Sequence, residues 1–378
     1  IFNRERNWIS RKQKKRKRRK IIKWILFPIL IIGLSAGVYG ALLYKKAESV
    51  INDSYKPVET SSKRVEKADP KIDNISILLI GVDESEDRKK IYGDSTRTDA
   101  LMVATLNEKE KSIKLVSIPR DSYVKIPGRK SKTKINHAHA YGGTELTIET
   151  VQELLDIPID YYVKMNFHAF IDVVDSLGGI EAEVPYELFE QDSKDRADAI
   201  HLKPGIQELD GEQALALART RHYDSDLERG KRQQEIVKSV IKKTVSFNSI
   251  PKQSDVIEAV GKNMTTNLSF SEMTSLISYV TAGSDLQIQS LNLEGSDSMI
   301  NSVYYYQLNE QSLKDIILQL KTHLDLVEDE ELDSLMTNND KDNIESLSVN
   351  NRRKDSPGDN SEDLDEKAFL RKYNNIQD

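Results

Sequence analysis

The chain has 378 residues, a formal net charge of −6 and no cysteine. The lack of cysteine excludes disulfides, thiol nucleophiles and zinc sites built from thiolates, and it suits an oxidising location. One large region, residues 72–326, is long enough to bury a core of its own. Beyond Val327 the chain holds 15 acidic and 7 basic side chains and few large apolar ones, which predicts a disordered tail over residues 327–378.

A membrane anchor is predicted near the N-terminus. Residues 1–20 form a basic head, with RKQKKRKRRK at positions 11–20, and an apolar segment follows at 21–44. Its uncharged part, Trp24 to Tyr44, has 21 residues and would be about 31 Å long as a helix, close to the thickness of a bilayer core. The segment is too long for an ordinary cleaved signal. The basic head predicts a cytoplasmic N-terminus, so the linker 45–71 and all that follows should be extracytoplasmic.

Two features of this segment have alternative interpretations. Gly33 and Gly37 lie on one helix face and could support a weak dimer through the transmembrane helix, although small residues are common in such helices. The basic head alone would also suit nucleic-acid binding, but its position against a membrane span favours a role in topology and in contact with anionic lipid. We therefore expect the membrane as a partner and no nucleic acid.

Three strands are predicted at the start of the globular region. The apolar run Ile75 to Ile80 reads as a buried strand, and Asp83 would lie just beyond its carboxyl end, where α/β sheets gather ligands. A second strand begins at Arg97, and its period of two puts Arg97 and Asp99 on the same side. A third strand, Ile113 to Ile118, forms a hairpin with the second and ends at Pro119, directly before Arg120.

Helices and strands alternate after this hairpin. A helix capped by Thr144, a strand at 159–165, a helix that stops at Gly178 and a strand at 180–184 follow one another. This alternation predicts an α/β protein in which a mixed sheet is covered by helices. The segment 252–326 should complete the domain with helices and a strand near residues 286–293.

The densest group of charged residues follows a predicted capping box formed by Asp210 and Gln213. The run ARTRHYDSDLERGKRQQ occupies positions 218–234, and Arg229, Arg232 and Gln233 recur at helical spacing on one face. A solvated charged helix is the ordinary interpretation of such a run. Arginine dominates over lysine here, however, and its planar fork suits bidentate recognition of phosphate.

Several stretches together resemble the LytR-CpsA-Psr family of Gram-positive bacteria. They are GVD at 81–83, STRTDALMVATL at 95–106, VSIPRDSYVKIPG at 116–128, KINHAHAYGG at 134–143, the segment 160–185, and the arginine-rich run at 218–234. The resemblance covers a core of residues 72–245. It implies a central mixed β-sheet between α-helices, preceded by one transmembrane helix, with an apolar groove for a polyprenyl chain.

The resemblance also implies roles for individual residues. Asp83 and Asp99 correspond to an acidic pair that positions a divalent cation, Mg²⁺ or Mn²⁺. The groups implied to hold a diphosphate are Arg97, Arg120, Arg219, Arg221, Arg229, Arg232 and Gln233. The groups implied to act in catalysis are Asp99, Arg120, Asp226 and Arg229. Lys134 matches the family more weakly.

The implied activity is transfer of an anionic glycopolymer, of teichoic acid or capsule type, from polyprenyl (undecaprenyl) diphosphate to peptidoglycan at the outer face of the cell membrane. Phosphoryl transfer is catalysed mainly by positioning and by neutralising charge, which cations around a diphosphate provide. Asp99 and Asp226 both remain candidates for the base. A non-catalytic polyprenyl phosphate sensor or an anchored regulator would keep the groove and the arginines without needing Asp83 and Asp99. Zinc bound by His137 and His139 is disfavoured, since no further ligand motif accompanies the pair.

Overall fold

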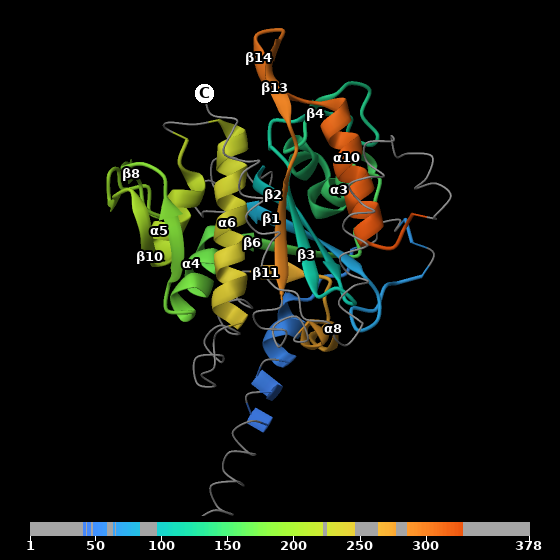
Figure 1. Cartoon of the computed structure of the whole chain (residues 1–378), viewed down its shortest axis with the longest axis horizontal. Helices are drawn as coiled ribbons and strands as arrows, with labels where there is room; N and C mark the ends of the chain where they lie inside the picture. The colour runs from blue at the N-terminus through green and yellow to red at the C-terminus, as the bar shows by residue number, and fades with distance from the viewer. Residues whose placement is uncertain are drawn as a thin grey trace, which may run out of the picture. The chain divides into compact units, whose positions relative to one another are not determined.

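A six-stranded mixed sheet forms the centre of the protein in the computed structural model (Figure 1). The structure describes residues 41–42, 44–46, 48–58, 63–64, 66–83, 97–221, 225–245, 264–276 and 286–327. The strands lie in the order β11 (Met264–Thr266), β6 (Tyr161–Asn166), β1 (Ile75–Val82), β2 (Thr98–Asn107), β3 (Ser112–Ser117) and β12 (Gln287–Asn292). β1 and β6 are parallel, as are β3 and β12, whereas the other three pairings are antiparallel.

Helices cover both faces of this sheet. On one face, α3 (His137–Leu155) and α10 (Glu310–His323) pack against β1, β2 and β3 through a core that includes Leu78, Val103 and Leu320. On the other face, α6 (Asp226–Val245) crosses β3 and β12. Because the central strands are covered on both sides, their side chains are apolar in both alternating sets, and burial of these sets holds the layers together.

A smaller layer packs beside α6. It contains α4 (Phe167–Ser176), β7 (Ile180–Val184), β8 (Leu188–Glu190), β9 (Ile200–Leu202), β10 (Gly205–Leu209) and α5 (Gly211–Arg219). These elements share an apolar cluster with Ile236 of α6, so the layer holds α5 and α6 in contact. The predicted capping box fixes the start of α5, since Asp210 accepts from the backbone N–H of Gln213 at 2.9 Å and Gln213 accepts from that of Asp210 at 3.0 Å.

Two hairpins and a short helix complete the described chain. One hairpin joins β4 (Tyr123–Val124) to β5 (Thr133–Lys134), and the other joins β13 (Gly295–Ile300) to β14 (Val303–Leu308). Helix α8 (Phe270–Ser275) lies against the N-terminal part of the domain, where Tyr44 contacts Phe270 with ring centroids 4.9 Å apart.

The predicted α/β class, with its mixed sheet between helices, is confirmed. The β2–β3 hairpin and the strand near residues 286–293 also form as predicted. The helix predicted to start at Thr144 begins earlier, at His137, with a kink at Gly142 and Gly143. The described residues include no helix long and apolar enough to cross a bilayer. The predicted span lies almost entirely within residues 1–40, and nearly all of the predicted tail lies within residues 328–378, both outside the described residues.

Candidate active site

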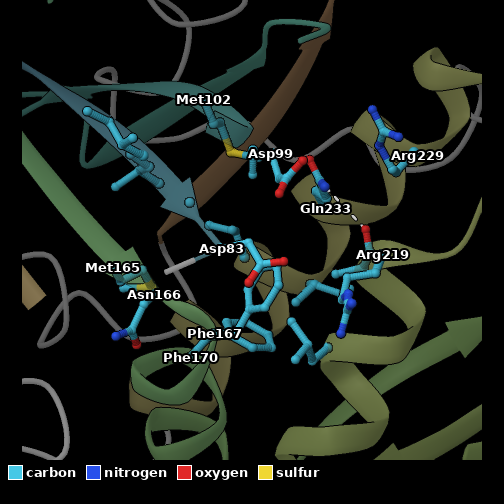
Figure 2. Close-up of a pocket in the computed structure, with 18 of the residues that line it drawn as sticks. Asp83, Asp99, Met102, Met165, Asn166, Phe167, Phe170, Arg219, Arg229 and Gln233 are labelled. Carbon is cyan, nitrogen blue, oxygen red and sulfur yellow. Dashed lines mark hydrogen bonds between the residues drawn. The ribbon is translucent and has the colours of Figure 1, made fainter. Parts of the chain in front are cut away.

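A cavity of about 700 Å³ lies between the sheet and the helices α4, α5 and α6. Its walls are mostly apolar, and residues such as Leu79, Met102, Phe170 and Val240 line it. Its polar end, called the mouth below, is lined by side chains from all parts of the domain: Asp83, Asp99, Arg120, Arg219, Arg221, Arg229 and Gln233. Figure 2 shows Asp83, Asp99, Arg219 and Gln233 around one space, with Phe167 and Phe170 adjacent. The site thus joins a charged mouth to the apolar part of the cavity, called the tunnel below.

A β-bulge brings the two acidic residues of the mouth together. β1 and β2 pair in register up to Gly81 and Ala100, and then Val82 pairs with Thr98, so that Asp99 is the extra residue on β2. Such bulges re-aim a side chain and are frequent beside active sites. Asp83 follows the last residue of β1 and is buried. Both carboxylates therefore reach the same edge of the sheet.

The arginines of the mouth come from a strand end and from two helix ends. Arg120 follows β3 and donates to Asp99 at 2.7 Å. Arg219 is the last residue of α5, and its guanidinium lies 4.8 Å from the centroid of the Phe167 ring. Arg221 lies 3.8 Å from Asp99. These contacts hold three guanidinium groups around one side of the cavity.

Arg229, on the first turn of α6, is the most deeply buried of these cations. It is 4% exposed and pairs with Asp226 at 2.8 Å. Burial, together with the charges of Arg221 and Arg120 and only partly offset by Asp226, lowers the pKa of Arg229 to about 10. Burial and Arg120 likewise lower the pKa of Arg221. These arginines crowd one another at the cost of stability, and an anion bound among them would relieve that repulsion.

Two buried guanidinium N–H groups at the mouth have no hydrogen-bond acceptor among the described residues. They belong to Nη1 of Arg229 and Nε of Arg120. Buried polar groups are nearly always paired, and a buried donor without an acceptor needs an explanation such as a bound ion or ligand. The donors are guanidinium groups beside a charged cavity, so the ligand they suit is anionic.

The donor set also fits a divalent cation. Mg²⁺ prefers hard oxygen ligands and is usually held by one or two carboxylates together with water and the phosphates of a substrate. Asp83 and Asp99 supply two such carboxylates at the mouth. Within the described ranges, no cluster of three or more His, Asp or Glu side chains could form a metal cage from protein ligands alone. A cation here would therefore depend on the substrate for part of its coordination.

Two predicted diphosphate ligands lie elsewhere. Arg97 is exposed and does not line the cavity, because the bulge at Asp99 breaks the alternation that would have placed both side chains together. Arg232 is also absent from the cavity wall. Its Nε and Nη2 donate to the carbonyls of Leu217 and Thr220 at 3.2 and 2.8 Å, so it binds the end of α5. Gln233 lines the cavity and donates to the carbonyl of Ala218 at 3.2 Å.

The structure adds a residue that the sequence analysis did not single out. Asp121 is buried beside Arg120 and pairs with Lys134 at 2.9 Å. Burial raises the pKa of Asp121, but the hydrogen bond from Lys134, the charges of Arg120 and Lys134 and the contact with Asp226 outweigh it, so the pKa is lowered. The only sign of Asp121 in the sequence was its position directly after Arg120. Glu190 and Gln191 also line the cavity, and no sequence motif pointed to them.

The fold and the site define an α/β protein with an arginine-lined mouth on an apolar cavity. A sequence profile of the LytR_cpsA_psr family matches residues 41–322, and the chain belongs to that family. The polyisoprenyl-teichoic acid–peptidoglycan teichoic acid transferase TagT of Bacillus subtilis (strain 168) is 40% identical over 324 residues, 83% of this chain and 99% of TagT. The transferase TagU of the same organism is 36% identical over 322 residues, 83% of this chain and 99% of TagU.

Solved structures share the fold. A structure described as TagT bound to LIIa-WTA is 40% identical, with a TM-score of 0.61, and the match covers 72% of this chain and 99% of that one. A second, of the LytR-CPS2A-psr family protein YwtF (TagT) with bound octaprenyl pyrophosphate lipid, is 38% identical, with a TM-score of 0.57 and the same coverage.

Proposed function

We propose that this protein transfers an anionic glycopolymer of teichoic acid type from a polyprenyl diphosphate carrier to peptidoglycan and releases polyprenyl phosphate. The observation that carries the proposal is the convergence of Arg120, Arg219, Arg221 and Arg229 at the end of an apolar cavity, with buried N–H groups for which the described part of the chain offers no acceptor. A diphosphate joined to an isoprenoid combines these two chemistries in one molecule. The named activities of the TagT and TagU relatives support the same assignment.

In this proposal the diphosphate lies at the mouth and the lipid fills the tunnel. Arg120, Arg219 and Arg221 bind the phosphate oxygens, and Arg229 supplies its free N–H to the oxygen that gains charge in the transition state. Fixed donors in a site that excludes water stabilise such charge strongly. Gln233 adds a neutral donor at the same end. Arg97 and Arg232, which lie outside the cavity, do not contact the diphosphate in this proposal.

The reaction is a displacement at the phosphorus that carries the polymer. A sugar hydroxyl of peptidoglycan forms the new O–P bond, and the bond from that phosphorus to the bridging oxygen of the diphosphate breaks. The leaving group is polyprenyl phosphate, and the hydroxyl proton passes to Asp99 or Asp226. Asp83 and Asp99 would hold Mg²⁺ or Mn²⁺, which would neutralise charge on the phosphates when bound. A capsular polysaccharide would suit the same chemistry as an alternative polymer.

The proposal places the domain outside the cell on a single N-terminal anchor. Val237 and Ile241, which line the tunnel, pack in the same apolar cluster as Met273 of α8. Tyr44, at the end of the predicted span 21–44, contacts Phe270 of α8. The apolar end of the tunnel is therefore linked through α8 to the segment that would enter the membrane, which suits a lipid that remains partly in the bilayer.

The test is transfer by the purified full-length chain in detergent, with a polyprenyl diphosphate donor and peptidoglycan as acceptor. Arg120→Ala and Arg219→Ala should each lower turnover by about 10²-fold or more. The matched control is Arg196→Ala, since the Arg196 side chain is 71% exposed and pairs only with Asp192 among described residues. Unchanged turnover in both mouth variants would refute the proposal. Lipid binding without any product would instead favour a sensor.

A further inference from the structure

The loop between β4 and β5 carries a dense and unbalanced positive charge. The 23 residues from Ser122 to Thr144 include five Lys and Arg and no Asp or Glu. Four of these cations are exposed on the loop, and they are Lys125, Arg129, Lys130 and Lys132, called the basic loop below. None of the four forms an ion pair with another described residue. An exposed cluster of one sign attracts polymers of the opposite sign.

The basic loop begins beside the mouth and is held there by two contacts. The backbone N–H of Asn136 donates to the carbonyl of Arg120 at 3.2 Å, and Lys134 at the end of β5 pairs with Asp121. The positive field extends sideways as well. Burial lowers the pKa of His137, and the charges of Arg97 and Lys134 lower it further, so these two cations lie close to His137. Beyond Asp121, which Lys134 pairs with, all the charged side chains from Ser122 to Thr144 are cations.

Aromatic rings support these cations. The guanidinium of Arg129 lies 4.0 Å from the centroid of the Tyr141 ring, and Nζ of Lys132 lies 5.9 Å from that of Tyr123. Tyr123 packs in turn on Tyr305 of β14, with centroids 4.7 Å apart. Such contacts limit the freedom of long side chains, so less entropy is lost when they bind a ligand.

We infer that the basic loop binds the polyanionic part of the donor, a chain of phosphodiester repeats that leaves the mouth on the side opposite the lipid. This inference rests on the proposed function for the identity of the polymer. A lipid-linked diphosphate has its lipid on one side and its polymer on the other. Because the lipid fills the tunnel, the polymer must leave through the mouth, where the basic loop begins. A neutral glycan would gain nothing from four exposed cations.

The consequence is a preference for donors that carry several phosphodiester repeats. Each exposed ion pair with a phosphate raises the affinity for the polymer by a small factor. Three such pairs together should raise it roughly tenfold at low salt. Salt screens contacts of this kind, and the gain should shrink at high ionic strength.

The experiment measures binding of a lipid-free glycerol phosphate oligomer to the full-length chain in detergent, at low and at high salt. The variant Arg129→Gln/Lys130→Gln/Lys132→Gln should bind the oligomer about tenfold more weakly at low salt. The matched control, Lys56→Gln/Lys71→Gln/Lys203→Gln, removes the same charge from exposed lysines elsewhere and should bind like the wild type. Equal binding by the wild type and the loop variant would overturn the inference. Loop-dependent binding of a neutral N-acetylhexosamine oligosaccharide, without binding of the oligomer, would overturn it in favour of the acceptor.

A turnover measurement separates this inference from the proposed function. The loop variant should transfer a donor without phosphodiester repeats at the wild-type rate, and it should lose about tenfold in kcat/KM on a donor with repeats. A wild-type chain that transfers neither donor would refute the proposed function, while the binding result would still decide the role of the basic loop.

Discussion

Replacing Arg229 by methionine should separate stability from activity. Arg229 is 4% exposed and is surrounded by other arginines, and its pKa is lowered to about 10. A pKa below the ordinary value of an arginine means that the folded state disfavours the charge. At about 1.4 kcal/mol for each pKa unit, the penalty is on the order of 3 kcal/mol at neutral pH, with the ion pair to Asp226 already included.

Methionine matches the aliphatic stem of arginine and carries no charge, so Arg229→Met should raise the free energy of unfolding by about 1 to 3 kcal/mol. The same variant loses a donor aimed at the phosphates, and transfer should fall by about 10²- to 10³-fold. Thermal denaturation of the full-length chain measures the first effect, and turnover with the lipid-linked donor measures the second.

The control is Arg232→Met, one turn further along α6. Arg232 donates to the carbonyls of Leu217 and Thr220, so its loss leaves acceptors without donors and should cost about 1 to 3 kcal/mol of stability. Transfer should fall by less than about tenfold, since Arg232 lies outside the cavity. Two results would refute this reasoning: a loss of stability in Arg229→Met, or unchanged transfer by that variant. Either result would mean that the repulsion among the arginines of the mouth does not serve to bind an anion.

Three further predictions concern pH, metal and lipid. Burial and the charge of Lys114 lower the pKa of His323 to about 4, so the unfolded chain takes up the proton first and stability should fall by roughly 2 to 3 kcal/mol between about pH 6.5 and pH 4. Denaturant unfolding at both pH values should show that His323→Gln lacks this loss, and equal losses would contradict the assignment. A chelator should abolish transfer, Mg²⁺ or Mn²⁺ should restore it, and Asp83→Asn should raise the Mg²⁺ concentration for half-maximal turnover by roughly tenfold. Insensitivity to the chelator would remove the metal from the site. Val240→Trp should obstruct the tunnel and lower kcat/KM by roughly tenfold for long-chain donors, but not for a short-chain analogue, and equal effects on both would argue against a lipid in the tunnel.

Local patterns predicted most of the central fold. The run Ile75 to Ile80 could be recognised because all its residues except Ser76 are apolar, as in a strand buried on both sides. The capping box of Asp210 and Gln213 could be recognised because both halves lie within four residues. The β13–β14 hairpin could not, since its strands are largely exposed and lack a regular apolar alternation.

The site was predictable as a set of residue types and less so as a geometry. Arg120 lies in one motif and Arg219 and Arg229 lie in another, and the family resemblance brought them together before any contact was known. The bulge at Asp99 depends on pairing between two strands, so no count along one strand reveals it. For the same reason the alternation predicted from Arg97 to Asp99 does not continue across the bulge. Arg232 matched helical spacing, but its direction depends on how α5 folds back against α6, which spacing along one helix does not reveal.

The end of α5 at Arg219 presents a repulsive pole to any phosphate at the mouth. The carboxyl end of a helix carries partial negative charge on carbonyl oxygens that lack partners within the helix. Here the carbonyls of Leu217, Ala218 and Thr220 are shielded by donors from Arg232 and Gln233. A protein engineer who moved only the cavity arginines to another scaffold would leave such a pole uncovered, and the transplanted pocket would hold the anion more weakly.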